Sequence, residues 1–119
     1  MRIRSDIWVQ AFIRGRQATG DLCVVARHGD DTAGAIYVKV LCEGRTALLY
    51  GPPPMSLSQE DSFDRRFECR FAGKAMPEFE IDDAMRKEAS FDPDLWIVEV
   101  EVCRDREGLD RWLTRVAGG

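Results

Sequence analysis

Residues 35–51 contain two apolar runs joined by a two-residue link, and this arrangement limits the folds open to the chain. The runs are AIYVKVLC (35–42) and RTALLYG (45–51), with Glu43-Gly44 between them. A link this short forces the two strands to lie side by side and antiparallel. The chain must therefore form a β-sheet whose apolar side needs a cover.

Three further runs are typical of strands because they are rich in valine or alternate between apolar and charged residues. They are DLCVVARH (21–28), RRFECRFAG (65–73) and LWIVEVEV (95–102). The short connections among 21–28, 35–42 and 45–51 predict an antiparallel meander. Strict alternation over 65–73 predicts a strand with one face in water.

Helices are predicted before, between and after these strands. Ser5 is expected to cap a first helix and Gly20 to end it, while Pro77 suits the first turn of a second helix over 78–90. A short last helix is expected around Leu109–Val116. The order is α-β-β-β-β-α-β-α, which predicts a single α+β domain over 1–119 with a mainly antiparallel five-stranded sheet covered by helices.

Composition restricts the classes of function. The chain has 119 residues, of which 45% are hydrophobic, and its net charge of −4 makes nucleic acid an unfavourable partner. Neither a secretory leader nor a membrane span is expected, because no apolar run is long enough. The four cysteines are widely spaced and have apolar neighbours, which predicts reduced thiols in a cytoplasmic protein without a bound cofactor.

Four segments resemble a bacterial family known as domain of unknown function 1491. They are IWVQAFIR (7–14), VVARHGDDTAGAIYVKV (24–40), YGPPP (50–54) and FDPDLWIVEVEV (91–102). Together they span nearly the whole chain, and the last is the most specific. The resemblance implies no established activity, cofactor or catalytic residue, so any site must be argued from the residues themselves.

The first candidate site surrounds the only histidine. His28 is followed by Asp30 and Asp31, and a histidine beside carboxylates can act as a base or share a metal ion. The same segment also has the composition of a turn: Gly29 and Gly34 supply permissive backbone, and the aspartates can form local hydrogen bonds. We favour the turn and keep a small enzyme or metal-binding protein as the alternative.

A second candidate is the pair Asp92 and Asp94, since paired carboxylates can perform acid–base chemistry or bind cations. The competing interpretation is that Asp92-Pro93 ends the helix and begins a turn.

A third group of residues suggests contact with another protein. Val9 and Ile13 extend the apolar surface of the first helix beyond a normal stripe, interrupted only by Arg16. The proline loop after 45–51 places further apolar side chains on a stiff backbone. The candidate interface residues are Val9, Ile13, Arg16, Tyr50, Met55 and Leu57. The sequence therefore favours a noncatalytic protein-binding or accessory module that binds a protein partner or self-associates.

Overall fold

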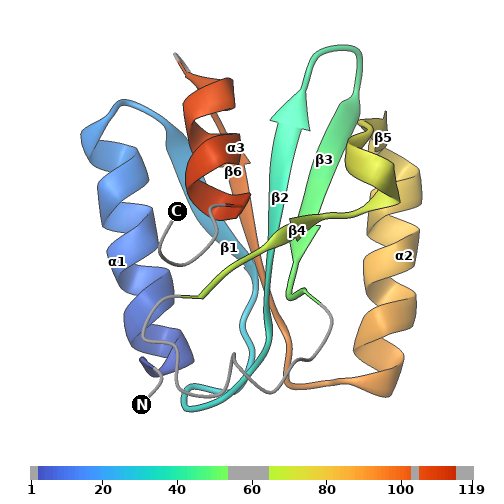
Figure 1. The fold of residues 1–119 in the computed structure, drawn as a ribbon. Coiled ribbons are helices and arrows are strands. Elements are labelled where there is room, and N and C mark those ends of the chain that lie inside the picture. The colour runs from blue at the N-terminus through green and yellow to red at the C-terminus, as the bar shows by residue number, and fades with distance from the viewer. Residues whose placement is uncertain (1–2, 54–64, 103–104, 115–119) are drawn as a thin grey trace.

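Figure 1 shows the computed structural model, which describes residues 3–53, 65–102 and 105–114. Its helices are α1 (Ser5–Ala18), α2 (Glu78–Phe91) and α3 (Arg106–Thr114), with a 3₁₀ turn, η2, at Phe71–Gly73. Its strands are β1 (Leu22–Arg27), β2 (Ile36–Cys42), β3 (Thr46–Gly51), β4 (Glu68–Cys69), β5 (Met76–Pro77) and β6 (Trp96–Glu101). The predicted α+β class is confirmed. Within the described ranges, none of the helices is both long and apolar enough to cross a bilayer.

The strands follow the order β1-β6-β2-β3-β4, and β5 pairs separately with β3. The antiparallel hairpin of β2 and β3 is confirmed. The predicted three-stranded meander is wrong, because β6 lies between β1 and β2, antiparallel to the first and parallel to the second. The connection over 28–35 is long enough for β1 and β2 to lie apart with β6 between them. Its backbone also bonds to the start of β6, because the Trp96 N–H donates to the Ala35 carbonyl at 2.7 Å.

The sheet is covered on both faces, with α1 and α2 on opposite sides (Figure 1). One face packs against α1 and α3, and its core comprises Trp8, Val9, Phe12, Cys23, Ile36, Val38, Val40, Tyr50, Phe67, Trp96, Val98, Val100, Leu109 and Leu113. The other face packs against α2 around Tyr37, Ala47, Leu49, Ile81, Met85 and Leu95. Both faces of the central strands are therefore largely apolar, as expected for a buried sheet, with Lys39 as a buried charge on the α2 face.

The ends of α1 agree with the sequence only in part. Gly20 adopts a left-handed φ of +93° and donates its N–H to the Gln17 carbonyl at 3.0 Å, so its role in ending the helix is confirmed. Ser5 is not the cap, because Arg4 occupies that position. The Ser5 hydroxyl is instead buried and donates to the Gly34 carbonyl at 2.6 Å, which attaches the helix to the β1–β2 connection.

The strand predicted over 65–73 is wrong in length. Only β4, two residues long, pairs with β3. The chain then turns, because Phe71 and Ala72 both have left-handed φ angles, near +57° and +55°. The alternation of apolar and charged side chains did not predict the length of this strand, because the pattern does not show where the backbone stops pairing with the neighbouring strand.

The helix and strand at the C-terminal side of the fold are confirmed. Ile81 and Met85 are the buried residues of α2, and the helix ends at Phe91, directly before Asp92-Pro93. In β6 the predicted inward face, Trp96, Val98 and Val100, is buried. Leu109 and Leu113 anchor α3 as expected, while Val116 lies outside the described residues.

Candidate functional site

His28 lies at the solvent-exposed end of the β1–β2 connection. Its Nε2 is 2.9 Å from Asp31 Oδ1, and its side chain is 67% exposed. The imidazole also packs on the indole of Trp96, with ring centroids 4.1 Å apart. The ring thus covers the outer side of a core tryptophan.

The Asp30 side chain stabilises the turn. Its Oδ2 accepts the N–H groups of Thr32 and Ala33 at 3.1 and 2.9 Å, and its carbonyl accepts the indole N–H of Trp96 at 2.8 Å. These bonds are those of a side-chain-stabilised turn fastened to the first residue of β6. The described geometry therefore supports the turn interpretation of this segment.

Gly29 and Gly34 are required here for a reason that the sequence did not show. Neither belongs to the glycines with left-handed φ angles. A Cβ atom at Gly29 or Gly34 would instead lie 2.2 or 2.3 Å from the Asp94 carbonyl oxygen. The glycines allow the main chain of the β1–β2 connection to touch the segment before β6.

The two aspartate-containing candidates therefore meet through their main chains. The Asp30 N–H donates to the Asp94 carbonyl at 2.9 Å, while Asp92 Oδ1 accepts the Asp94 N–H at 3.2 Å. Among the described residues, no group of three or more histidine, cysteine, aspartate or glutamate side chains is placed to hold a metal ion. The catalytic or metal-binding use of His28 with these aspartates stays a hypothesis.

The structure does not leave Val9 and Ile13, two of the candidate interface residues, available to a partner. Val9 is 1% exposed, and Ile13 packs partly buried against the same core. Ile7 and Ala11, on the same helix, are exposed. The apolar residues of α1 nearly surround the helix, so their pattern alone left its rotation undetermined, and the surrounding core selects the Trp8–Val9–Phe12 side.

The remaining candidate interface residues either already contact other residues of the chain or lie outside the described residues. Arg16 Nη1 lies 3.5 Å from Asp21 Oδ2, and the Arg16 guanidinium lies over the ring of Phe12. Tyr50 is buried, and its hydroxyl donates to Asp110, so it is not displayed for a partner. Burial, together with the Asp110 hydrogen bond, raises the Tyr50 pKa. Met55 and Leu57 lie outside the described residues.

Three cysteines are free thiols in the described part of the chain: Cys23, Cys42 and Cys69. Burial raises the pKa of Cys23 to about 11, which makes it a poor nucleophile at neutral pH. This agrees with a packing role. Cys103 lies outside the described residues.

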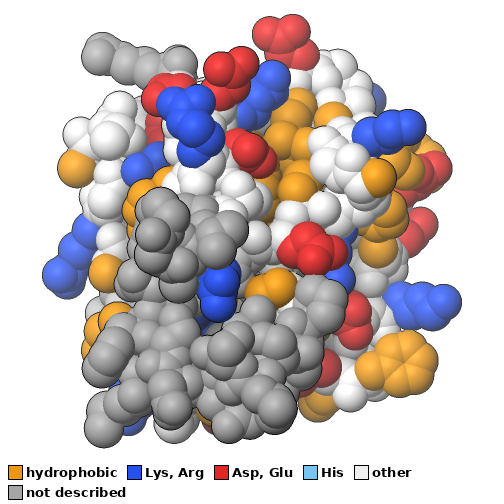
Figure 2. Space-filling model, in the orientation of Figure 1, with side chains coloured by type: hydrophobic (Ala, Val, Ile, Leu, Met, Phe, Trp, Pro, Cys, Tyr) orange, Lys and Arg blue, Asp and Glu red, His pale blue; other side chains and the backbone are white. Residues whose placement is uncertain are grey.

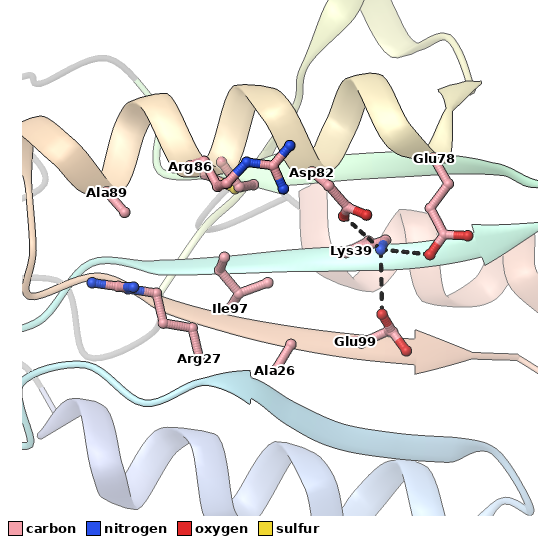
Figure 3. Close-up of a pocket in the computed structure, with 10 residues that line it drawn as sticks. Ala26, Arg27, Lys39, Glu78, Asp82, Arg86, Ala89, Ile97 and Glu99 are labelled. Atoms are coloured by element: carbon pink, nitrogen blue, oxygen red, sulfur yellow. Dashed lines mark hydrogen bonds and ion pairs between the residues drawn. The ribbon is translucent and has the colours of Figure 1, made fainter.

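Sequence reasoning missed a buried lysine on the opposite side of the sheet. The Nζ of Lys39, on β2, lies 2.7 Å from Glu78 and 2.8 Å from Asp82 on α2, and 3.3 Å from Glu99 on β6 (Figure 3). Two signals were available: a single lysine within an apolar strand, and two acids one helical turn apart at 78 and 82.

The acidic neighbours of Lys39 favour its protonated form, which is not a nucleophile or a base. Burial opposes its positive charge, but hydrogen bonds and attraction from Asp82, Glu78 and Glu99 outweigh this effect and raise the Lys39 pKa. A lysine acts as a nucleophile or base when its pKa is lowered. Lys39 is therefore an ammonium ion that joins α2 to the sheet.

The lysine forms one wall of a pocket of about 420 Å³ between α2 and the β6–β1 side of the sheet. Apolar walls come from Ala26, Met85, Ala89 and Ile97, and the other lining residues are Arg27, Lys39, Glu78, Asp82, Arg86 and Glu99 (Figure 3). The pocket exists because α2 packs over β3 and β2 and leaves the β1 side of this face open. Apolar side chains also stand among acidic and basic ones over α2 (Figure 2), and Phe79 and Phe91 are exposed there.

The open side of the pocket is bordered by an unusual strand. β1 lies at one edge of the sheet, and three of its exposed residues are aliphatic: Leu22, Val24 and Val25 are 63%, 56% and 40% exposed. Strands at sheet edges are normally short or carry charges that prevent pairing with other chains. The opposite edge follows this rule with the two-residue β4. β1 is six residues long and has its only charge at Arg27.

Comparisons with known proteins agree with this fold. The family model described as "Protein of unknown function (DUF1491)" matches residues 3–110. The solution structure of protein Atu0922 from A. tumefaciens is 37% identical, with a TM-score of 0.73, and the match covers 87% of this chain and 89% of that one. The crystal structure of a DUF1491 family protein from Caulobacter crescentus CB15 is 33% identical, with a TM-score of 0.68 and coverage of 85% and 87%.

An NMR structure of a DUF1491 family protein from the same organism is 32% identical, with a TM-score of 0.69, and the match covers 89% of this chain and 91% of that one. No curated protein matches the chain. Because the family model covers most of the chain and the solved relatives share about a third of its residues, the chain belongs to the DUF1491 family of proteins of unknown function.

Proposed function

We propose that this protein is a noncatalytic protein-binding module of the cytoplasm whose contact surface is the β1 edge of the sheet. The observation that carries the proposal is the exposure of Leu22 and Val24 on one face of β1 and of Val25 on the other, on a strand that pairs with β6 alone among the described strands. Reduced thiols at Cys23 and Cys42 support the cytoplasmic location.

A sheet edge suits protein binding because its outer N–H and C=O groups can bond to an added strand. Such β-augmentation takes affinity from the main chain and specificity from alternate side chains. The two edges of this sheet differ: β4 is short, whereas β1 remains long and aliphatic. Exposed aliphatic residues along an unprotected edge carry a risk of aggregation. A partner that covers β1 gives these residues a function.

The described chemistry elsewhere supports binding over catalysis. Lys39 has a raised pKa, and Asp30 is engaged by the N–H groups of its own turn. The net charge of −4 favours a protein or peptide over nucleic acid.

Site-specific photo-crosslinking in the cell tests the proposal. A photoreactive amino acid replaces Val24. A matched variant carries it at Lys87, an exposed position of α2 that does not line the pocket between α2 and the sheet. We expect a discrete adduct from position 24 that position 87 does not give, whether it contains another protein or a second copy. Equal labelling from both positions, or no adduct from position 24, contradicts the proposal.

A further inference from the structure

We infer that the β1 edge binds an extended basic segment, whose lysine or arginine side chains lie over Leu22 and Val24 and reach Glu101 and Glu99. This inference rests on the proposed function and specifies its partner. It comes from the register of β1 and β6, where Leu22 is paired with Glu101 and Val24 with Glu99. Leu22 and Val24 thus each have a carboxylate directly behind them, whereas Val25 is paired with Val98.

The spacing of this pattern matches an added strand. Paired residues in antiparallel strands point to the same face, so Leu22, Val24 and both glutamates point to the α2 side. Neighbouring strands lie about 4.8 Å apart, which places an added strand about 10 Å from β6. A lysine or arginine can lay its aliphatic stem over the β1 side chain and extend its charged end to the next strand. Alternate basic residues on one segment therefore fit both positions.

The charge around these positions is negative. Lys39 lies beside Glu99, and its single charge is shared among Glu78, Asp82 and Glu99. The side chain of Glu101 is exposed, and it forms no ion pair within the described ranges. Complementary charge across an interface guides association and disfavours wrong partners. A basic segment is therefore attracted to the β1 edge beside Glu99 and Glu101, and an acidic segment is repelled.

A second copy of the chain fits less well than a basic segment. In an antiparallel pair of β1 strands, Leu22 and Val24 would meet the same aliphatic residues and leave Glu99 and Glu101 without cations.

The test uses the full chain and a synthetic peptide of known composition. The probe is N-acetyl-Lys-Thr-Lys-Val-Lys-Thr-amide, compared with the same peptide carrying glutamate in place of lysine, and affinities are measured by calorimetric titration at low and high salt. We expect the lysine peptide to bind at least about tenfold more tightly, with affinity falling as salt screens the charges. Amide hydrogen exchange should slow along β1.

Two charge reversals locate the contact. Glu101→Lys should weaken the lysine peptide about tenfold, whereas Glu107→Lys, an exposed change of the same charge on α3, should alter its affinity less than twofold. Equal affinities for the two peptides, or equal effects of the two variants, overturn the inference. If an adduct still forms from position 24 in the cell, the binding module stands and only its basic partner is refuted. If neither peptide binding nor an adduct is seen, both proposals fail.

Discussion

Replacing Trp96 tests how the β1–β2 connection is attached to the core. Trp96 is 2% exposed, its indole N–H donates to the Asp30 carbonyl at 2.8 Å, and its ring packs against His28. Trp96→Phe keeps an aromatic ring but removes the donor and part of the buried surface. Trp96→Ala removes the whole side chain.

The expected magnitudes follow from these contacts. Losing the smaller ring area of Trp96→Phe costs about 1 kcal/mol at ~25 cal/mol per Å². The unpaired Asp30 carbonyl adds about 1–3 kcal/mol. We expect a loss of about 2–4 kcal/mol in the free energy of unfolding. Trp96→Ala should cost about 4–8 kcal/mol, because truncating a core aromatic costs about 3–5 kcal/mol before the lost hydrogen bond is counted. Since domains of this size are stable by about 5–15 kcal/mol, the alanine variant should be marginally folded.

The assay is urea denaturation followed by far-ultraviolet circular dichroism, which does not depend on the altered tryptophan. Trp112→Phe is the matched control, because Trp112 is 41% exposed and its loss should cost less than about 1 kcal/mol. If the free energy of unfolding of Trp96→Phe stays within about 0.5 kcal/mol of the parent's, with an unchanged slope, the role given to the indole hydrogen bond is refuted.

Three other perturbations have expected outcomes. Gly34→Ala should destabilise by more than about 2 kcal/mol in denaturation, because its Cβ would meet the Asp94 carbonyl at 2.3 Å, whereas Gly15→Ala in α1, with nothing within 4 Å, should stabilise by about 0.5–1 kcal/mol. His28→Gln should lower stability by less than about 1 kcal/mol, as an exposed ion pair contributes little, and a larger loss in thermal melts would show that the ring is essential. Lys39 has a folded-state pKa above its ordinary 10.5, so its contribution is complete below pH 10.5 and is lost as pH rises through the folded-state pKa. The stability gap between the parent and Lys39→Met should therefore narrow at alkaline pH, and a gap that widens would contradict the ion cluster.

Local periodicity predicted the elements whose side chains alternate between one buried and one exposed face. The helix Glu78–Phe91 and the strand Trp96–Glu101 were both located closely, because a fixed apolar spacing and a following or preceding proline mark their ends. The turn around Asp30 was also predictable, since its hydrogen bonds are made to Thr32 and Ala33 nearby in the chain.

Strand order was not predictable from the same signals. Alternation specifies which side chains are buried but not which strand supplies the hydrogen bonds, so β1 and β2 were placed as neighbours. Leu95 and Ile97 did mark the start of β6 as apolar on its second face, a feature of strands inside a sheet. The Lys39 cluster depends on this order as well, because Glu99 reaches Lys39 only when β6 lies beside β2.

The position of β6 also explains why the candidate binding surface could not be read from the sequence. The run LCVVAR has the composition of an interior strand, and the sequence does not show which strands lie beside it. In the structure β1 lies at the edge, and its neighbour is β6, which places Glu99 and Glu101 behind Val24 and Leu22. An aliphatic strand without protective charges along its exposed face is costly to keep at an edge unless something covers it. The topology therefore gives β1 an acidic neighbour, and this combination of aliphatic and acidic side chains is the surface at which we place the partner.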